Sequence, residues 1–199
     1  MCLCSFHPGG GHFYQKTAFL RSAVELTLVL GGLSSGKTAL ALSLAQRFIP
    51  PRVYIGTAEP IDEEMAQKIA QHRAERDESW QTVEAPLELG RALRESDKKE
   101  ISLILVDGLG VWVGNLFAKK IDYQKYIIEF LDTLSFVETP LIIVSEEVGL
   151  GGISPSPEVR RWGEALGKLN QALAERAKRV ALVVAGFPLW LKGGDYEPS

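Results

Sequence analysis

The stretch that decides the fold is Leu26-Thr27-Leu28-Val29-Leu30-Gly31-Gly32-Leu33-Ser34-Ser35-Gly36-Lys37-Thr38. Residues 26–30 form a short apolar run that predicts a buried strand, and residues 37–48 predict a helix. A glycine-rich turn between the two, ending in Lys-Thr, is typical of a phosphate-binding loop. A chance glycine-rich turn would rarely combine the strand, the glycine spacing, Lys-Thr and the helix.

The loop supplies the groups that a nucleoside triphosphate needs. Its glycines let successive backbone N–H groups point inward, and the start of the helix adds positive potential. Lys37 would contact the β- and γ-phosphates, and the Thr38 hydroxyl would bind Mg²⁺. We expect ATP or GTP with Mg²⁺ here, held by Gly31, Gly32, Leu33, Ser34, Ser35, Gly36, Lys37 and Thr38.

A second metal-binding side chain is expected at the end of a neighbouring strand. Asp107 directly follows the apolar run 101–106 and has that position. An aspartate there could instead cap the next helix.

Strand and helix signals alternate along the rest of the chain. Strands are predicted at 53–55, 81–83, 101–106, 141–144 and 180–184, and helices at 62–76, 86–94, 111–118, 123–136 and 157–178. This alternation predicts an α/β fold of three layers, with helices on both faces of a mainly parallel, RecA-like sheet. We expect residues 25–199 to form one P-loop nucleotide-binding catalytic domain and residues 1–24 a flexible extension.

Composition excludes some classes of function. With 199 residues and a net charge of −3, the chain lacks the positive field that broad nucleic-acid binding needs. No apolar run approaches the roughly 20 residues of a membrane span, and no secretory leader is recognisable. Cys2 and Cys4 lie too close together to staple a core, so the cytoplasm is the expected compartment.

The predicted helix 62–76 carries a histidine on its apolar face. At about 100° per residue, Met65, Ile69, His72 and Arg76 fall on one side of the helix. An imidazole beside an arginine suits a site for an anionic substrate. Alternatively, the histidine is a core residue whose hydrogen bonds are made within the protein, and the arginine side chain extends to water.

Ordered motifs along most of the chain then resemble one family. They are Gly31 to Thr38, Tyr54 to Glu59, Asp62 to Met65, Ile69 to Arg76, Trp80 to Pro86, Leu105 to Asp107 with Trp112 and Asn115-Leu116, Glu147 to Gly151, Gly167 to Gln171 and Val183 to Gly186. The pattern resembles the bifunctional adenosylcobinamide kinases and adenosylcobinamide-phosphate guanylyltransferases of cobalamin biosynthesis, over about residues 26–192.

The resemblance implies two reactions. ATP or GTP would phosphorylate the aminopropanol hydroxyl of adenosylcobinamide. GMP from GTP would then pass, through a covalent intermediate on His72, to adenosylcobinamide phosphate. Neutral imidazole is nucleophilic near pH 7, and cationic side chains would stabilise charge on the α-phosphate. The implied nucleotide contacts are Thr57, Ala58, Glu59, Arg73, Ala74, Glu75, Arg76, Glu84 and Asp107. Either Glu84 or Asp107 could read the guanine edge.

The chain also departs from the family pattern. Glu146 stands where the family usually has asparagine, and Gly108, Gly110 and Gly114 replace what are commonly cysteine, threonine and serine. These changes raise the question of whether the corrinoid pocket and the kinase half are intact. The resemblance further implies a homo-oligomer, specifically a trimer. The apolar stretch 111–117 could serve its interface or the core.

Other functions fit parts of the sequence. Asp107-Gly108-Leu109-Gly110 fits the Asp-x-x-Gly of switch GTPases, but the Asn-Lys-x-Asp guanine reader of those proteins is absent. A P-loop small-molecule kinase without guanylyl transfer would not label His72. A nucleotide-sensing module would bind GTP without releasing pyrophosphate.

Overall fold

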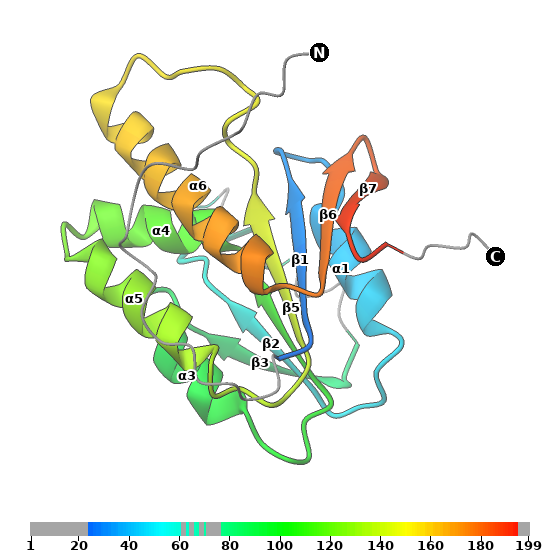
Figure 1. The fold of residues 1–199 in the computed structure, drawn as a ribbon. Helices are drawn as coiled ribbons and strands as arrows, with labels where there is room; N and C mark the ends of the chain where they lie inside the picture. The colour runs from blue at the N-terminus through cyan, green and yellow to red at the C-terminus, as the bar shows by residue number, and fades with distance from the viewer. Residues whose placement is uncertain (1–23, 61–62, 64–65, 68–69, 71–76, 195–199) are drawn as a thin grey trace, which may run out of the picture.

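The computed structural model describes residues 24–60, 63, 66, 67, 70 and 77–194. A seven-stranded sheet forms its centre, in the order β3-β2-β4-β5-β1-β6-β7 (Figure 1). The strands are β1 (Leu26–Gly31), β2 (Arg52–Gly56), β3 (Trp80–Glu84), β4 (Leu103–Asp107), β5 (Leu141–Glu146), β6 (Arg179–Val184) and β7 (Phe187–Lys192).

The pairing confirms the predicted mainly parallel sheet. Among the strand pairs of the described residues, only β6–β7 is antiparallel. β5 lies between β1, which leads into the phosphate loop, and β4, which ends at Asp107. One strand thus separates the strand of the phosphate loop from the strand of Asp107. This is the order of RecA-like sheets, the class that the sequence predicts. Because the strands are parallel, their carboxyl ends meet at one edge of the sheet, where ligands bind in such folds.

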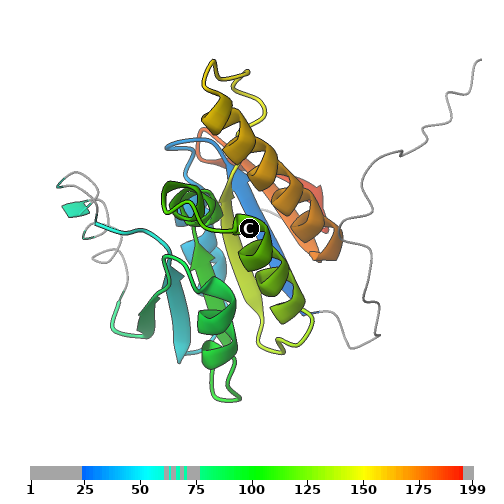
Figure 2. The same ribbon diagram turned by 90° about the vertical axis from the view of Figure 1, so that its left-hand side faces the viewer.

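Helices cover the two faces unequally (Figures 1 and 2). Among the described helices, α1 (Lys37–Ala45) alone packs on the face that includes Val29, Leu105 and Val144. The other face is covered by α3 (Leu89–Ser96), α4 (Leu109–Ala118), α5 (Tyr123–Thr133) and α6 (Pro157–Arg176). None of these helices is both long and apolar enough to cross a bilayer. The predicted helix 62–76 falls largely outside the described residues, although Glu63, Ala66, Gln67 and Ala70 are helical.

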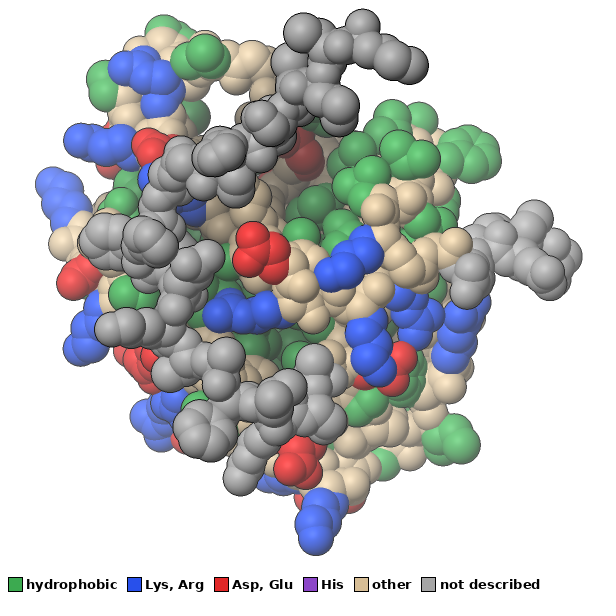
Figure 3. Space-filling view, viewed as in Figure 1, with side chains coloured by type: hydrophobic (Ala, Val, Ile, Leu, Met, Phe, Trp, Pro, Cys, Tyr) green, Lys and Arg blue, Asp and Glu red, His purple; other side chains and the backbone are tan. Residues whose placement is uncertain are grey.

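The sequence did not predict β7. Phe187, Leu189 and Leu191 are 77%, 58% and 57% exposed, so the strand lacks the buried apolar run that marked the others. Pro188 within it suits an edge strand, which leaves one row of backbone groups unpaired. Hydrophobic side chains gather on this side of the molecule (Figure 3).

The apolar stretch 111–117 mainly serves the core. Trp112, Val113 and Leu116 are fully buried. The Trp112 ring packs against Phe130 with 5.4 Å between centroids, and its Nε1 donates to Leu87 O at 2.8 Å. Core packing, one of the two uses left open by the sequence, is therefore the one observed.

Trp112→Ala should lower the free energy of unfolding by about 3–5 kcal/mol, because it leaves a large cavity and removes the hydrogen bond from the indole to Leu87 O. Urea denaturation followed by circular dichroism would measure the loss. Phe136→Ala is the matched control, since that ring is 66% exposed. Equal losses in the two variants would contradict the core role of Trp112.

Candidate nucleotide-binding and phosphoryl-transfer site

The phosphate loop lies between β1 and α1 and rests on the turn between β6 and β7. Gly36 caps α1 with φ +92°, a left-handed conformation that favours glycine. A Cβ on it would lie 3.2 Å from Gly186 Cα, and Gly186 N–H donates to Ser35 O at 2.9 Å. The loop is thus shaped both by its own glycines and by a turn far away in sequence.

Lys37 occupies the position expected for a phosphate-binding lysine. Its side chain is 12% exposed, and its Nζ donates to Gly32 O at 3.2 Å. Nζ also lies 3.7 Å from Glu146 Oε1. The cation is therefore held over the loop, beside a carboxylate that sequence reasoning did not count among the site residues.

Asp107 and Thr38 come together as a metal site requires. Thr38 Oγ1 donates to Asp107 Oδ2 at 3.0 Å, and the Tyr54 hydroxyl donates to the same oxygen at 3.1 Å. Mg²⁺ prefers oxygen ligands and takes few of them from protein when phosphates supply the rest, so this pair fits the ion. Asp107 does not cap α4, because Gly108 is the N-cap residue.

Thr57 lies beneath the site rather than facing it. It is fully buried, and its Oγ1 donates to Gly108 O at 2.7 Å and accepts from Gly108 N at 3.1 Å. Asn115 Nδ2 donates to Thr57 O at 2.8 Å. These bonds fix the backbone that follows Asp107. A nucleotide contact by Thr57 stays a prediction.

The other predicted nucleotide contacts are less enclosed. Ala58 and Glu59 are partly exposed, and Glu59 pairs with Lys119 at 3.0 Å. Glu84 is exposed at the end of β3 and aligns with Gly56 of β2, which aligns with Asp107 of β4. Glu84 therefore shares the carboxyl edge of the sheet with the loop. His72, Arg73, Ala74, Glu75 and Arg76 lie outside the described residues.

The chain that follows residue 76 is anchored at the amino ends of the strands, opposite the carboxyl ends that carry the phosphate loop. Ser79 donates side-chain and backbone hydrogen bonds to Asp77, and these bonds lower the pKa of that carboxyl, with Arg52 adding to the effect. The Arg52 guanidinium lies 4.6 Å from the centroid of the Trp80 ring. Residues 77–80 are therefore fixed beside the starts of β2 and β3.

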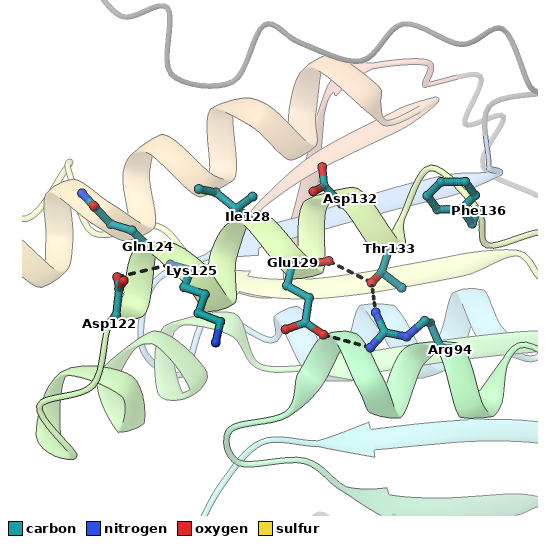
Figure 4. A pocket seen from close by; sticks show the side chains of 9 residues that line it. All are labelled: Arg94, Asp122, Gln124, Lys125, Ile128, Glu129, Asp132, Thr133 and Phe136. Carbon is teal, nitrogen blue, oxygen red and sulfur yellow. Dashed lines mark hydrogen bonds and ion pairs between the residues drawn. The ribbon is translucent and has the colours of Figure 1, made fainter.

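The hollows on the described surface include the following two. One, of about 650 Å³, lies between α3 and α5 (Figure 4), where Arg94 is already bound by Thr133 Oγ1 and Glu129 Oε1, both at 2.8 Å. None of its lining residues belongs to the phosphate loop. The other, of about 540 Å³, lies between α6 and the segment after β5 and reaches Leu30 of β1. It adjoins the carboxyl edge that carries the site.

Comparison with known proteins agrees with the geometry. The sequence model of the family described as cobinamide kinase / cobinamide phosphate guanyltransferase matches residues 27–191. The chain belongs to this family. A bifunctional adenosylcobalamin biosynthesis protein, CobP of Pseudomonas aeruginosa PAO1, is 40% identical over 170 residues, covering 83% of this chain and 96% of the relative. CobU of Escherichia coli K12, with the same description, is 30% identical over 182 residues, covering 84% and 99%.

The solved structures that are similar to this chain at low sequence identity include the following two. The KaiC-like protein PH0186 of Pyrococcus horikoshii has a TM-score of 0.48 at 15% identity, covering 79% of this chain and 70% of that one. The flagellar accessory protein FlaH of Methanocaldococcus jannaschii has a TM-score of 0.46 at 14% identity, covering 87% and 82%.

Membership in the cobinamide kinase / guanyltransferase family confirms the predicted resemblance and makes the chain an enzyme of cobalamin biosynthesis that uses nucleotides. The switch-GTPase and nucleotide-sensing hypotheses are thereby set aside. Sequence reasoning missed three residues that shape the site: Tyr54, Asn170 and Glu146. Tyr54 and Asn170 stood within recognised motifs, and Glu146 was noted only as a departure.

Proposed function

We propose that this enzyme catalyses two successive reactions at one nucleotide site. It transfers the γ-phosphoryl group of ATP or GTP to the hydroxyl of adenosylcobinamide. It then takes GMP from GTP onto His72, releases pyrophosphate, and passes GMP to adenosylcobinamide phosphate, giving adenosylcobinamide-GDP. The observation that carries the proposal is the hydrogen bond between Thr38 and Asp107 beside Lys37, in a chain of this family.

The loop residues hold the triphosphate in both reactions. N–H groups at the start of α1 and the Lys37 ammonium neutralise the β- and γ-phosphates. Thr38 and Asp107 would hold Mg²⁺, which supplies positive charge against the phosphate oxygens. For guanylyl transfer, His72 is the nucleophile, and Arg73 and Arg76 stabilise charge that develops on the α-phosphate.

Specificity for the base and the corrinoid would come from the edges of the site. Glu84 is an exposed carboxylate that can accept hydrogen bonds from the N1–H and amino group of guanine. Thr57, Ala58, Glu59, Ala74 and Glu75 complete the expected nucleotide contacts. The hollow beside α6 is the proposed place for an edge of the corrinoid, because it is lined by Val148, Ile153 and Trp162 with Asn170 and Gln171. A homotrimer stays a prediction.

Labelled nucleotides test both halves. With γ-labelled ATP or GTP, label should move to adenosylcobinamide. With α-labelled GTP alone, label should become bound to protein and leave when adenosylcobinamide phosphate is added. A purified, folded enzyme that phosphorylates the corrinoid but never becomes labelled would support the kinase without guanylyl transfer.

A further inference from the structure

Glu146 ends the strand that separates the phosphate loop from Asp107. In the β1–β5 ladder Glu146 aligns with Gly31, the first glycine of the loop. In the β4–β5 ladder Asp107 aligns with Val144, two residues earlier. Glu146 therefore extends past Asp107 on the carboxyl side of the sheet. Its Oε1 lies 3.7 Å from Lys37 Nζ, the group that would contact the γ-phosphate.

Glu146 is held by groups from two helices. Its Oε2 accepts from Gly110 N at 2.7 Å, in the first turn of α4. From α6, Asn170 Nδ2 donates to the Glu146 backbone oxygen at 3.0 Å, and Trp162 Nε1 donates to Gly110 O at 3.1 Å. Both the backbone and the carboxylate of Glu146 are thus fixed before any substrate arrives.

The glycines after Asp107 make room for this carboxylate. A Cβ at residue 110 would overlap Glu146 Oε2, and a Cβ at residue 108 would lie 3.3 Å from Oε1. Glutamate at 146 and glycine at 110 therefore depend on each other. Three of the departures noted in the sequence thus form one arrangement, in which Gly108 and Gly110 leave the space that the Glu146 carboxylate fills.

An acid so close to bound phosphates needs a chemical reason. A negative charge near the γ-phosphate opposes nucleotide binding, and its ion pair with Lys37 competes with the phosphates for that cation. Oε2 is engaged by Gly110, whereas Oε1 faces Lys37 and the side chain is 25% exposed. Oε1 therefore keeps lone pairs that a hydroxyl donor can reach.

We propose that Glu146 accepts the proton of the corrinoid hydroxyl during phosphoryl transfer, an inference that rests on the kinase half of the proposed function. The hydroxyl oxygen forms a bond to the γ-phosphorus as the bond from that phosphorus to the bridging oxygen breaks. The electron pair of the broken bond leaves with the nucleoside diphosphate. The hydroxyl proton passes to Glu146 Oε1 and is later released to water. A positioned carboxylate has this role in protein kinases.

Glu146→Gln tests the proposal, because the amide oxygen can still accept from Gly110 N–H while basicity is lost. We expect kcat for phosphorylation of adenosylcobinamide to fall by about a hundredfold or more. The KM for nucleotide should change little or fall. The acid limb of the wild-type pH profile of kcat should be missing from the residual activity. Labelling of the protein by α-labelled GTP should continue, since it needs no hydroxyl acceptor.

Two further variants keep the test decisive. Gly110→Ala adds the methyl group that displaces the carboxylate, so it should cause the same selective loss even if Glu146→Gln folds poorly; thermal melts establish which variants are folded. Glu95→Gln is the matched control, because the Glu95 carboxylate is exposed on α3, where Arg91 Nε donates to it at 2.7 Å. It should keep phosphorylation within about twofold of wild type.

Other outcomes would overturn the proposal. Full phosphorylation by folded Glu146→Gln would show that no proton passes to residue 146. Parallel loss of phosphorylation and protein labelling, with weaker nucleotide binding, would show that Glu146 acts only by positioning Lys37. Failure of the proposed function looks different, because the wild-type enzyme itself would then transfer no phosphoryl group.

Discussion

Lys37→Ala should reduce both phosphorylation of adenosylcobinamide and labelling of the protein by α-labelled GTP, each by on the order of a thousandfold. The reason is that one ammonium group serves both reactions. It is largely enclosed above the loop, at 3.2 Å from Gly32 O, where its charge is poorly screened by water. Without it, the β- and γ-phosphates lose their closest cation in each transition state.

Lys98→Ala provides the control, because Lys98 is exposed on the loop after α3 and should leave both rates unchanged. Rates are measured at saturating nucleotide, so that weaker binding is separated from slower chemistry. A Lys37→Ala enzyme that loses phosphorylation but retains full protein labelling would contradict the proposal that one nucleotide site serves both reactions. It would indicate that GTP for guanylyl transfer binds elsewhere on the molecule.

His72→Ala should abolish labelling of the protein by α-labelled GTP while phosphorylation of adenosylcobinamide continues. Removing the nucleophile eliminates the covalent route, whereas γ-phosphoryl transfer uses the loop and Asp107 and has no step on the imidazole. The expected loss is complete to the limit of detection. Transfer of GMP to adenosylcobinamide phosphate should stop with it.

The other two histidines of the chain, His7 and His12, supply the matched control for this experiment. His12→Ala should be labelled like the wild-type enzyme. Label that persists on folded His72→Ala would assign the intermediate to another side chain. Loss of phosphorylation in the same variant would show that His72 also helps to hold the nucleotide or the corrinoid.

Local signals explain what could be predicted from the sequence. Residues 26–38 combine an apolar run, glycine spacing and a helix start, so strand, loop and helix were all predictable from neighbours in the chain. Asp107 was found for the same reason, because the four residues before it form a buried apolar run and it ends their strand. The order of elements then predicted three layers and a parallel sheet, which the strand pairing confirms.

Features that depend on distant residues were not predictable. β7 is an edge strand whose apolar side chains Phe187, Leu189 and Leu191 are exposed, so no buried run marks it in the sequence. The turn before it is recognisable as part of the site only from the hydrogen bond between Gly186 N and Ser35 O. Glu146 and Gly110 each resembled an isolated departure, since nothing in a linear sequence shows that one fills the space left by the other. The nucleotide contact by Thr57 stays a prediction, but the two hydrogen bonds between its hydroxyl and Gly108 were not predictable, because the two residues are 51 positions apart.

β1 lies in the middle of the sheet, and this position affects when the phosphate loop can form during synthesis of the chain. β1 pairs on one side with residues 141–146 and on the other with residues 179–183, so both neighbours are made long after it. Such non-local pairing slows folding, because distant segments must meet before their contacts can form. A chain emerging from the ribosome therefore carries the loop sequence before the partners of β1 exist, and the sheet and the turn at Gly186 that shape the loop assemble only after residues 179–186 have been made.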